Sequence, residues 1–152
     1  MPNELEVLLL VFRRLNSKKI DYMLTGSMAL NYYVMPRMTR DVDIVVALHS
    51  SQLMDLFKLF KDDFYIELES MKDALLHQKM FNIINNKFIV KVDFIIKKDN
   101  AFRDCEFNRR VKIKMEGVPT WIVSKEDLIL SKLFWAKDSL SEIQLKDVRL
   151  ML

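Results

Sequence analysis

The stretch Thr39-Arg40-Asp41-Val42-Asp43-Ile44-Val45-Val46 places two acids at the start of an apolar, β-branched run, which predicts a strand over 42–48. Successive side chains of a strand point to opposite faces. Asp41 and Asp43 therefore share one face, and the apolar residues between and after them face a core. Two carboxylates this close repel each other unless a cation lies between them, and Mg²⁺ or Mn²⁺ suits carboxylate ligands. The pair indicates a metal site.

A third acid interrupts a second apolar run, Lys91-Val92-Asp93-Phe94-Ile95-Ile96. An acid inside a buried strand is costly without a partner. If this strand lies beside the first one, Asp93 joins Asp41 and Asp43, and three carboxylates suffice for the two-metal sites used in nucleotidyl transfer. Without that convergence, Asp41 is equally well explained as a turn residue and Asp43 as a solvated one.

The two glycines contrast with the roughly ten that average usage would give. Gly117 lies between two strand-like runs and is explained by a tight turn. Gly26 follows the apolar run 22–25 and precedes a predicted helix, so it marks a sharp turn. The first N–H groups of a helix attract anions, and Ser27 adds a hydroxyl donor. The turn is a candidate phosphate site, although Ser27 could equally be a simple helix cap.

Hydrophobic periodicity and turn residues predict a mixed α+β fold in a single domain, 1–152. Paired asparagines, Asn85-Asn86, predict a two-residue hairpin, and 99–108 is expected to be irregular. Ser124 and Asp127 form a capping pattern that opens a helix. Helices are predicted at 3–18, 27–33, 51–60, 125–137 and 141–152, and a short helix or turn at 71–78. Strands are predicted at 22–25, 42–48, 65–68, 80–84, 87–96, 109–115 and 118–123.

Composition limits the kinds of ligand and the cellular location that we expect for this protein. The 152 residues carry a net charge of +3, which suits phosphate-bearing ligands without indicating a protein that coats nucleic acid. One cysteine, Cys105, excludes an intramolecular disulfide, and the start of the chain lacks the features of a signal peptide. No apolar run approaches the roughly 20 residues of a membrane span. We expect a cytoplasmic protein without a membrane segment.

Three short runs, Leu24-Thr25-Gly26-Ser27, Asp41-Val42-Asp43-Ile44 and Val92-Asp93-Phe94, together resemble the signature of the polymerase-beta-like nucleotidyltransferase superfamily. Within it, the chain looks most similar to AbiEii-type bacterial stand-alone nucleotidyltransferases, several of which belong to toxin–antitoxin pairs. The resemblance implies the nucleotidyltransferase fold, with a mixed β-sheet flanked by helices and a helical C-terminal tail.

The resemblance also implies roles for individual residues. Gly26 and Ser27 would bind nucleotide phosphates, Asp41 and Asp43 would bind metal, and Asp93 would complete the metal site and activate the acceptor hydroxyl. Lys132 and Asp147 match a later helical motif with a nucleotide-contacting lysine, although a lysine on an amphipathic helix is more often solvated. Arg37 and Arg40, just before the acids, could reach a triphosphate or remain on the surface.

These observations predict a Mg-dependent nucleotidyltransferase that moves a nucleoside monophosphate from an NTP to an acceptor hydroxyl by a two-metal mechanism. The acceptor could be RNA, a protein or a small molecule, and the protein could act in a toxin–antitoxin or phage-defence system. The alternative is a catalytically weak nucleotide-binding or antitoxin module that acts through a protein partner. A haloacid-dehalogenase phosphatase is disfavoured, because there the acids follow the apolar strand instead of preceding it.

Overall fold

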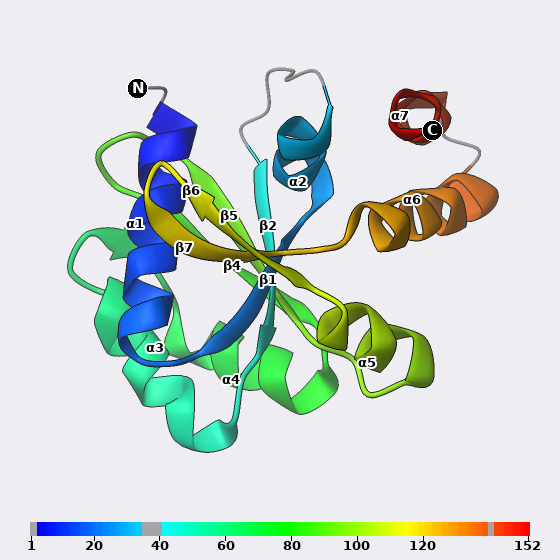
Figure 1. The fold of residues 1–152 in the computed structure, drawn as a ribbon. Helices are drawn as coiled ribbons and strands as arrows, with labels where there is room; N and C mark the ends of the chain where they lie inside the picture. The colour runs from blue at the N-terminus through cyan, green and yellow to red at the C-terminus, as the bar shows by residue number, and fades with distance from the viewer. Residues whose placement is uncertain (1–2, 35–40, 140–141) are drawn as a thin grey trace.

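A central sheet with helices on both faces forms the body of the computed structural model, which describes residues 3–34, 41–139 and 142–152, with side chains outside 135–144 (Figure 1). Within these ranges, seven strands lie in the order β3-β4-β5-β2-β1-β7-β6. The strands are β1 Asp21–Thr25, β2 Asp41–Ala47, β3 Phe64–Tyr65, β4 Met80–Asn85, β5 Lys91–Ile96, β6 Val111–Met115 and β7 Val118–Ile122. The helices are α1 Asn3–Ser17, α2 Gly26–Tyr33, α3 Leu53–Phe60, α4 Leu68–His77, α5 Ala101–Asn108, α6 Lys125–Ser139 and α7 Glu142–Met151, with a 3₁₀ turn at Ser50–Gln52.

The centre of the sheet is β2, which pairs antiparallel with β1 and parallel with β5. Parallel neighbours cannot be joined by a hairpin and need a long crossover. The segment from the 3₁₀ turn through α3, β3, α4 and β4 supplies it. The prediction of a mixed sheet in an α+β fold with a helical C-terminal end is confirmed.

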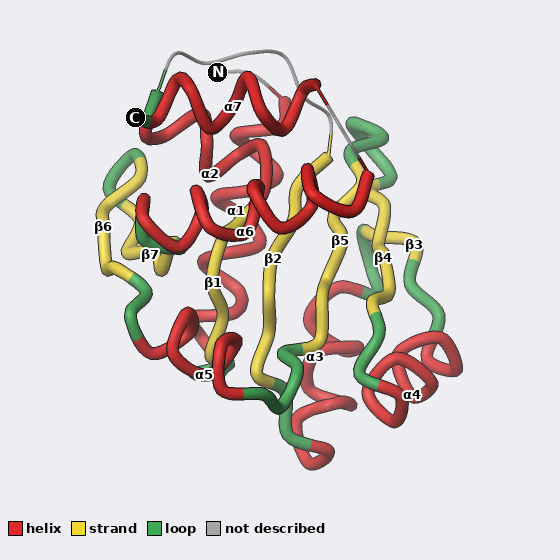
Figure 2. Tube along the Cα trace, turned by 90° about the vertical axis from the view of Figure 1, so that its right-hand side faces the viewer, coloured by secondary structure: helices red, strands yellow, loops and turns green. Residues whose placement is uncertain are grey.

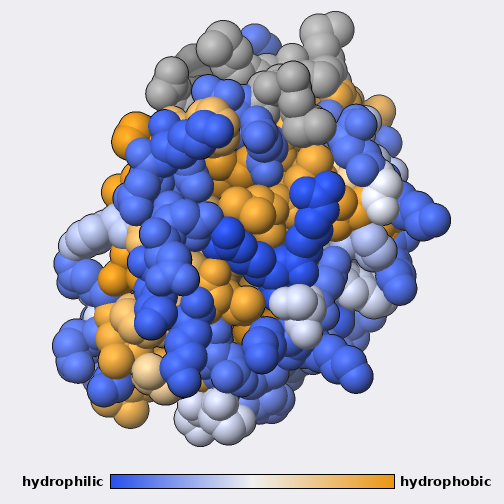
Figure 3. Space-filling view, turned by 90° about the vertical axis from the view of Figure 1, so that its left-hand side faces the viewer, coloured by the Kyte–Doolittle hydropathy of each residue, from blue (hydrophilic) through white to orange (hydrophobic). Residues whose placement is uncertain are grey.

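One face of the sheet holds the main core. Val42, Ile44 and Val46 are fully buried there. Phe12 of α1 stacks on Tyr22 of β1 with ring centroids 5.1 Å apart, and Phe60 of α3 lies 6.0 Å from Phe94 of β5. Helices α1 and α3 therefore cover this face, and Figure 3 shows that side of the molecule, where apolar surface remains visible between hydrophilic residues. Helices α2, α5, α6 and α7 lie on the other side (Figures 1 and 2).

The link between β4 and β5 differs from the predicted two-residue hairpin. β5 begins at Lys91, and residues 86–90 form a longer connection. The reason is the buried side chain of Asn85, whose Oδ1 accepts hydrogen bonds from the backbone N–H groups of Lys87 at 3.1 Å and Phe88 at 2.9 Å. Ile89, with φ of 55°, completes the loop. The loop is thus held by hydrogen bonds to an asparagine side chain, whereas the prediction relied on the backbone of Asn85-Asn86 adopting positive φ.

Residues 99–108 were predicted to be irregular, and this was wrong. They contain α5, whose N-cap Asn100 accepts a hydrogen bond from the backbone N–H of Arg103 at 2.9 Å. The predicted helix 51–60 begins instead with the 3₁₀ turn, α4 starts at Leu68, and β3 is shorter than the predicted strand 65–68. The Ser124 cap is confirmed, since its Oγ accepts from the Asp127 N–H at 3.1 Å.

The turn between β6 and β7 agrees with the predicted hairpin. Glu116 and Gly117 both have positive φ, 48° and 81°, as a two-residue hairpin turn requires. A search of the described helices finds none with the length and apolar character needed to cross a membrane.

Replacing Asn85 with alanine should lower the free energy of unfolding by about 1–3 kcal/mol, because two backbone donors lose their acceptor in a buried turn. Urea denaturation measures the change. Asn86→Ala, at an exposed neighbouring position, is the control and should stay within about 0.5 kcal/mol of the parent protein. Equal effects of the two substitutions would show that the Asn85 side chain does not organise the loop.

Candidate active site

The register of β2 and β5 brings two acids together. Asp43 lies directly opposite Asp93, while Asp41, two residues earlier on the same face of β2, lies opposite Lys91. Asp93 is 7% exposed, Asp43 is partly buried, and Asp41 is exposed. The condition set from the sequence, that the two acid-bearing strands lie side by side, is therefore met.

The surroundings of Asp43 and Asp93 are unfavourable for buried negative charge. The pKa of Asp43 is raised to about 6, first by burial and then by the charges of Asp93 and Asp41, with Lys91 acting in the opposite direction. Oδ1 of Asp93 is buried and has no hydrogen-bond donor among the described residues, although the Lys91 ammonium lies 3.4 Å from it. A buried carboxylate oxygen of this kind is costly unless a cation or donor is supplied.

The donor set fits a hard divalent cation. Mg²⁺ is typically bound by one or two carboxylates together with water and substrate phosphate, and seldom by a cage made of protein alone. Asp43 and Asp93 supply that pair. Across the ranges that the structure describes, no three acidic, histidine or cysteine side chains are gathered into a group able to hold a metal ion unaided.

The start of α2 lies against these acids. Gly26 has φ of +68°, and a Cβ at this position would overlap with Oδ2 of Asp43 and approach its Cβ to 3.1 Å. Glycine is therefore required by both conformation and space. The N-cap residue Thr25 makes no side-chain capping bond to the helix. The first turn of α2, with Ser27, is thus held beside the acid pair, and only the turn itself was foreseen from sequence.

A cleft of about 390 Å³ joins the acids to three helices. It begins at Gly26 and Ser27, passes Asp43 and Asp93, and continues over Val45 and Ile95 toward the carboxyl ends of β2 and β5. Figure 2 shows α6 crossing in front of the central strands and α5 below it. Both helices contribute to the lining, which comprises Thr25, Gly26, Ser27, Asp43, Val45, Met80, Asp93, Ile95, Ile96, Lys97, Lys98, Arg103, Glu106, Phe107, Leu128, Ser131 and Lys132.

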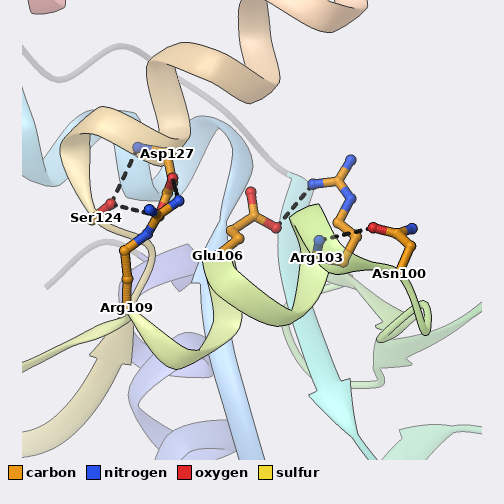
Figure 4. Close-up of polar contacts among 6 residues, drawn as sticks. All are labelled: Asn100, Arg103, Glu106, Arg109, Ser124 and Asp127. Carbon is orange, nitrogen blue, oxygen red and sulfur yellow. Dashed lines mark hydrogen bonds and ion pairs between the residues drawn. The ribbon is translucent and has the colours of Figure 1, made fainter.

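The contribution of α5 to the cleft was not predicted from the sequence. Glu106 is only 3% exposed, and its Oε1 accepts a hydrogen bond from Nη1 of Arg103 at 2.9 Å (Figure 4). Burial raises the pKa of Glu106, and Arg103 works against that shift. The acid and arginine three residues apart were the available signal, since this spacing places both on one side of a helix, but the segment was not recognised as helical.

Lys132 differs from a solvated helix lysine. It lines the cleft, is 6% exposed and forms a buried ion pair from Nζ to Oδ2 of Asp147 at 2.9 Å. The alternative of a surface lysine was wrong, because α7 packs on α6 and brings a fully buried acid to it. Arg37 and Arg40 lie outside the described residues.

Solved structures with the same fold are nucleotidyltransferase-like proteins. An antigenic nucleotidyltransferase-like protein from Paracoccidioides brasiliensis is 19% identical with a TM-score of 0.65, over 98% of this chain and 75% of that one. The lincosamide antibiotic adenylyltransferase LnuA, lincomycin-bound, is 15% identical with a TM-score of 0.63, over 96% and 94%. A putative nucleotidyltransferase from Thermotoga maritima is 15% identical with a TM-score of 0.63, over 93% and 90%. At these identities the likeness establishes the fold.

The curated proteins contain no match to this chain. The model of one protein family, described as nucleotidyltransferase of unknown function (DUF6036), matches residues 6–148 and so spans the sheet, the acids and nearly all of the C-terminal helices. The nearer resemblance to AbiEii-type proteins receives no support from these comparisons. The chain belongs to the nucleotidyltransferase family DUF6036.

Proposed function

We propose that this protein is a Mg-dependent nucleotidyltransferase that moves a nucleoside monophosphate from an NTP to an acceptor hydroxyl, with residues 1–152 acting as one domain. The observation that carries the proposal is the placement of Asp43 and Asp93 opposite each other on parallel strands, with the first turn of α2 packed against Asp43. A carboxylate pair beside a helix N-terminus suits metal-bound phosphate.

In this proposal Asp41, Asp43 and Asp93 would hold Mg²⁺ (or Mn²⁺). The bound ion would neutralise charge that builds up on the phosphate oxygens. Asp93 accepts the proton of the acceptor hydroxyl, whose oxygen forms a bond to the α-phosphorus. The bond from that phosphorus to the bridging oxygen breaks, and pyrophosphate leaves. The backbone at Gly26 and the hydroxyl of Ser27 hold the leaving phosphates, which helps to keep the reacting groups in line.

The remaining nucleotide contacts are proposed from position and charge. Lys132 borders the cleft on α6, where an ammonium group can approach the nucleotide, and its ion pair with Asp147 fixes its position. Arg37 and Arg40 precede β2 and are assigned to the triphosphate because their guanidinium groups match phosphate geometry. RNA, a protein or a small molecule remains as acceptor, and a toxin–antitoxin or phage-defence setting is part of the proposal.

Nucleotide binding should depend on the acids. Isothermal titration with ATP, GTP, CTP and UTP in Mg²⁺ is expected to give binding that weakens at least tenfold in Asp41→Ala/Asp43→Ala, because two of the three carboxylates that would hold the metal are removed. Asp62→Asn, which removes one exposed charge, should bind like the parent protein. Unchanged affinity in the double variant would refute the metal site. Nucleotide binding without label transfer, together with tight binding of a partner protein, would favour the alternative of an antitoxin or binding module.

Stability without metal should depend on pH through Asp43. Its folded pKa of about 6 lies above the ordinary value of 3.8, so the folded state holds this proton more tightly and the protein loses stability as pH rises between these values. In EDTA at pH 7, Asp43→Asn should therefore raise the free energy of unfolding by about 1–3 kcal/mol, measured by urea denaturation. Near pH 4 the difference should shrink, and Mg²⁺ should stabilise only the parent protein. A pH-independent difference would contradict this account.

Gly26 should tolerate substitution less well than Gly117. Both have positive φ, but only Gly26 faces an obstacle, since nothing lies within 4 Å of a Cβ built at Gly117. Gly117→Ala should cost about 1–2 kcal/mol from backbone strain alone. Gly26→Ala should cost more and should weaken Mg–NTP binding, because Asp43 must move. Equal losses of stability in urea, with nucleotide binding retained by both, would show that the close approach to Asp43 is unimportant.

A further inference from the structure

The two ends of the cleft differ in what they offer a reaction at the acids. At one end the first turn of α2 lies beside Asp43, and the proposed function places the leaving phosphates there. In-line transfer requires the acceptor to attack from the opposite side of the α-phosphate. From the acids, the cleft continues over Val45 and Ile95 to residues of α5. The acceptor therefore meets α5.

Two buried acids at α5 and the start of α6 accept different numbers of hydrogen bonds (Figure 4). Asp127 receives two hydrogen bonds from Arg109 and a third from the Ser124 hydroxyl, and its backbone N–H donates to the Ser124 cap of α6. Glu106 receives one, from Arg103 to Oε1, and its other oxygen has no hydrogen-bond donor among the described residues. Asp127 is therefore explained by structure alone, whereas Glu106 lines the cleft with an oxygen left for a ligand.

The charges around Glu106 limit what that ligand can be. Of the four basic side chains that line the cleft in the described part of the chain, three have carboxylate partners: Lys97 with Asp104, Lys132 with Asp147, and Arg103 with Glu106. Among the described lining residues this leaves only Lys98 without a carboxylate partner, which is little positive surface for a polyanion such as RNA. A charged donor makes a hydrogen bond to a carboxylate about twice as strong as a neutral donor does.

We propose that α5 is the acceptor wall of the cleft and that Glu106 binds the ammonium group of a small, hydroxyl-bearing acceptor. The inference rests on the proposed function for the direction of attack. Val45, Ile95 and Phe107 give the same region an apolar floor on which the ring of a small molecule can lie. Glu106 is thus a specificity-determining residue of the acceptor site, held in place by Arg103.

The test compares glucosamine with glucose, two sugars that share a ring and differ in one ammonium group. Each is titrated into the nucleotide-free protein and followed by amide NMR shifts. Glucosamine should bind about tenfold more tightly, with its largest shifts in α5, because a charge-assisted bond is added. Glu106→Gln, which keeps an oxygen for Arg103, should reduce the preference to about twofold or less. No preference in the parent protein, or an equal preference in Glu106→Gln, would overturn the proposal.

Two controls distinguish failure of this inference from failure of the proposed function. Glu69→Gln removes an equally negative but exposed side chain on α4 and should keep the preference for glucosamine. Mg–ATP affinity is measured in parallel and should change less than about twofold in Glu106→Gln. Loss of nucleotide binding in the parent protein would count against the proposed function, whereas intact nucleotide binding without a preference for glucosamine would count against the acceptor wall alone.

Discussion

The parallel pairing of β2 with β5 is the interaction on which the rest of the structure depends. It brings Asp43 and Asp93, fifty residues apart in sequence, to the same level of the sheet. The same pairing places Ile44 beside Phe94 on the opposite face, where α1 and α3 cover it. One register therefore serves both the core and the site, and a shift by one residue would turn the acids into the core.

The acid pair is a local cost that the surrounding structure sustains. Burial and like charge raise the pKa of Asp43, and Asp93 keeps a buried oxygen that no donor of the described residues reaches. Such arrangements are characteristic of sites that bind or react, because structure alone would favour apolar residues there. Gly26 adds a second such feature, since it brings a helix N-terminus against Asp43 where any other residue would clash.

The fold positions the acids, whereas the choice of acceptor depends on the side chains that line the cleft. A fold of this kind hosts many functions, and its specificity lies in side chains grafted onto it. Here α5 and α6 line the cleft, and α7 packs on α6. Helix α5 presents Glu106, one oxygen of which has no donor within the described part of the chain, and the α6–α7 pair encloses the ion pair of Lys132 with Asp147. The contrast between Glu106 and the fully bonded Asp127 separates a ligand-facing acid from a structural one.

The sequence alone determined the alternation of Asp41 and Asp43 on a strand, the turn at Gly26, the cap at Ser124 and the mixed sheet, because these follow from local periodicity and turn chemistry. Tertiary structure decided what depends on contacts between distant residues. The burial of Lys132 needed Asp147 from another helix, and the loop at Asn85 needed a side chain to capture its own backbone. The contribution of α5 to the cleft could not be predicted from local sequence patterns, because only the completed sheet brings Glu106 to the same cleft as Asp43 and Asp93.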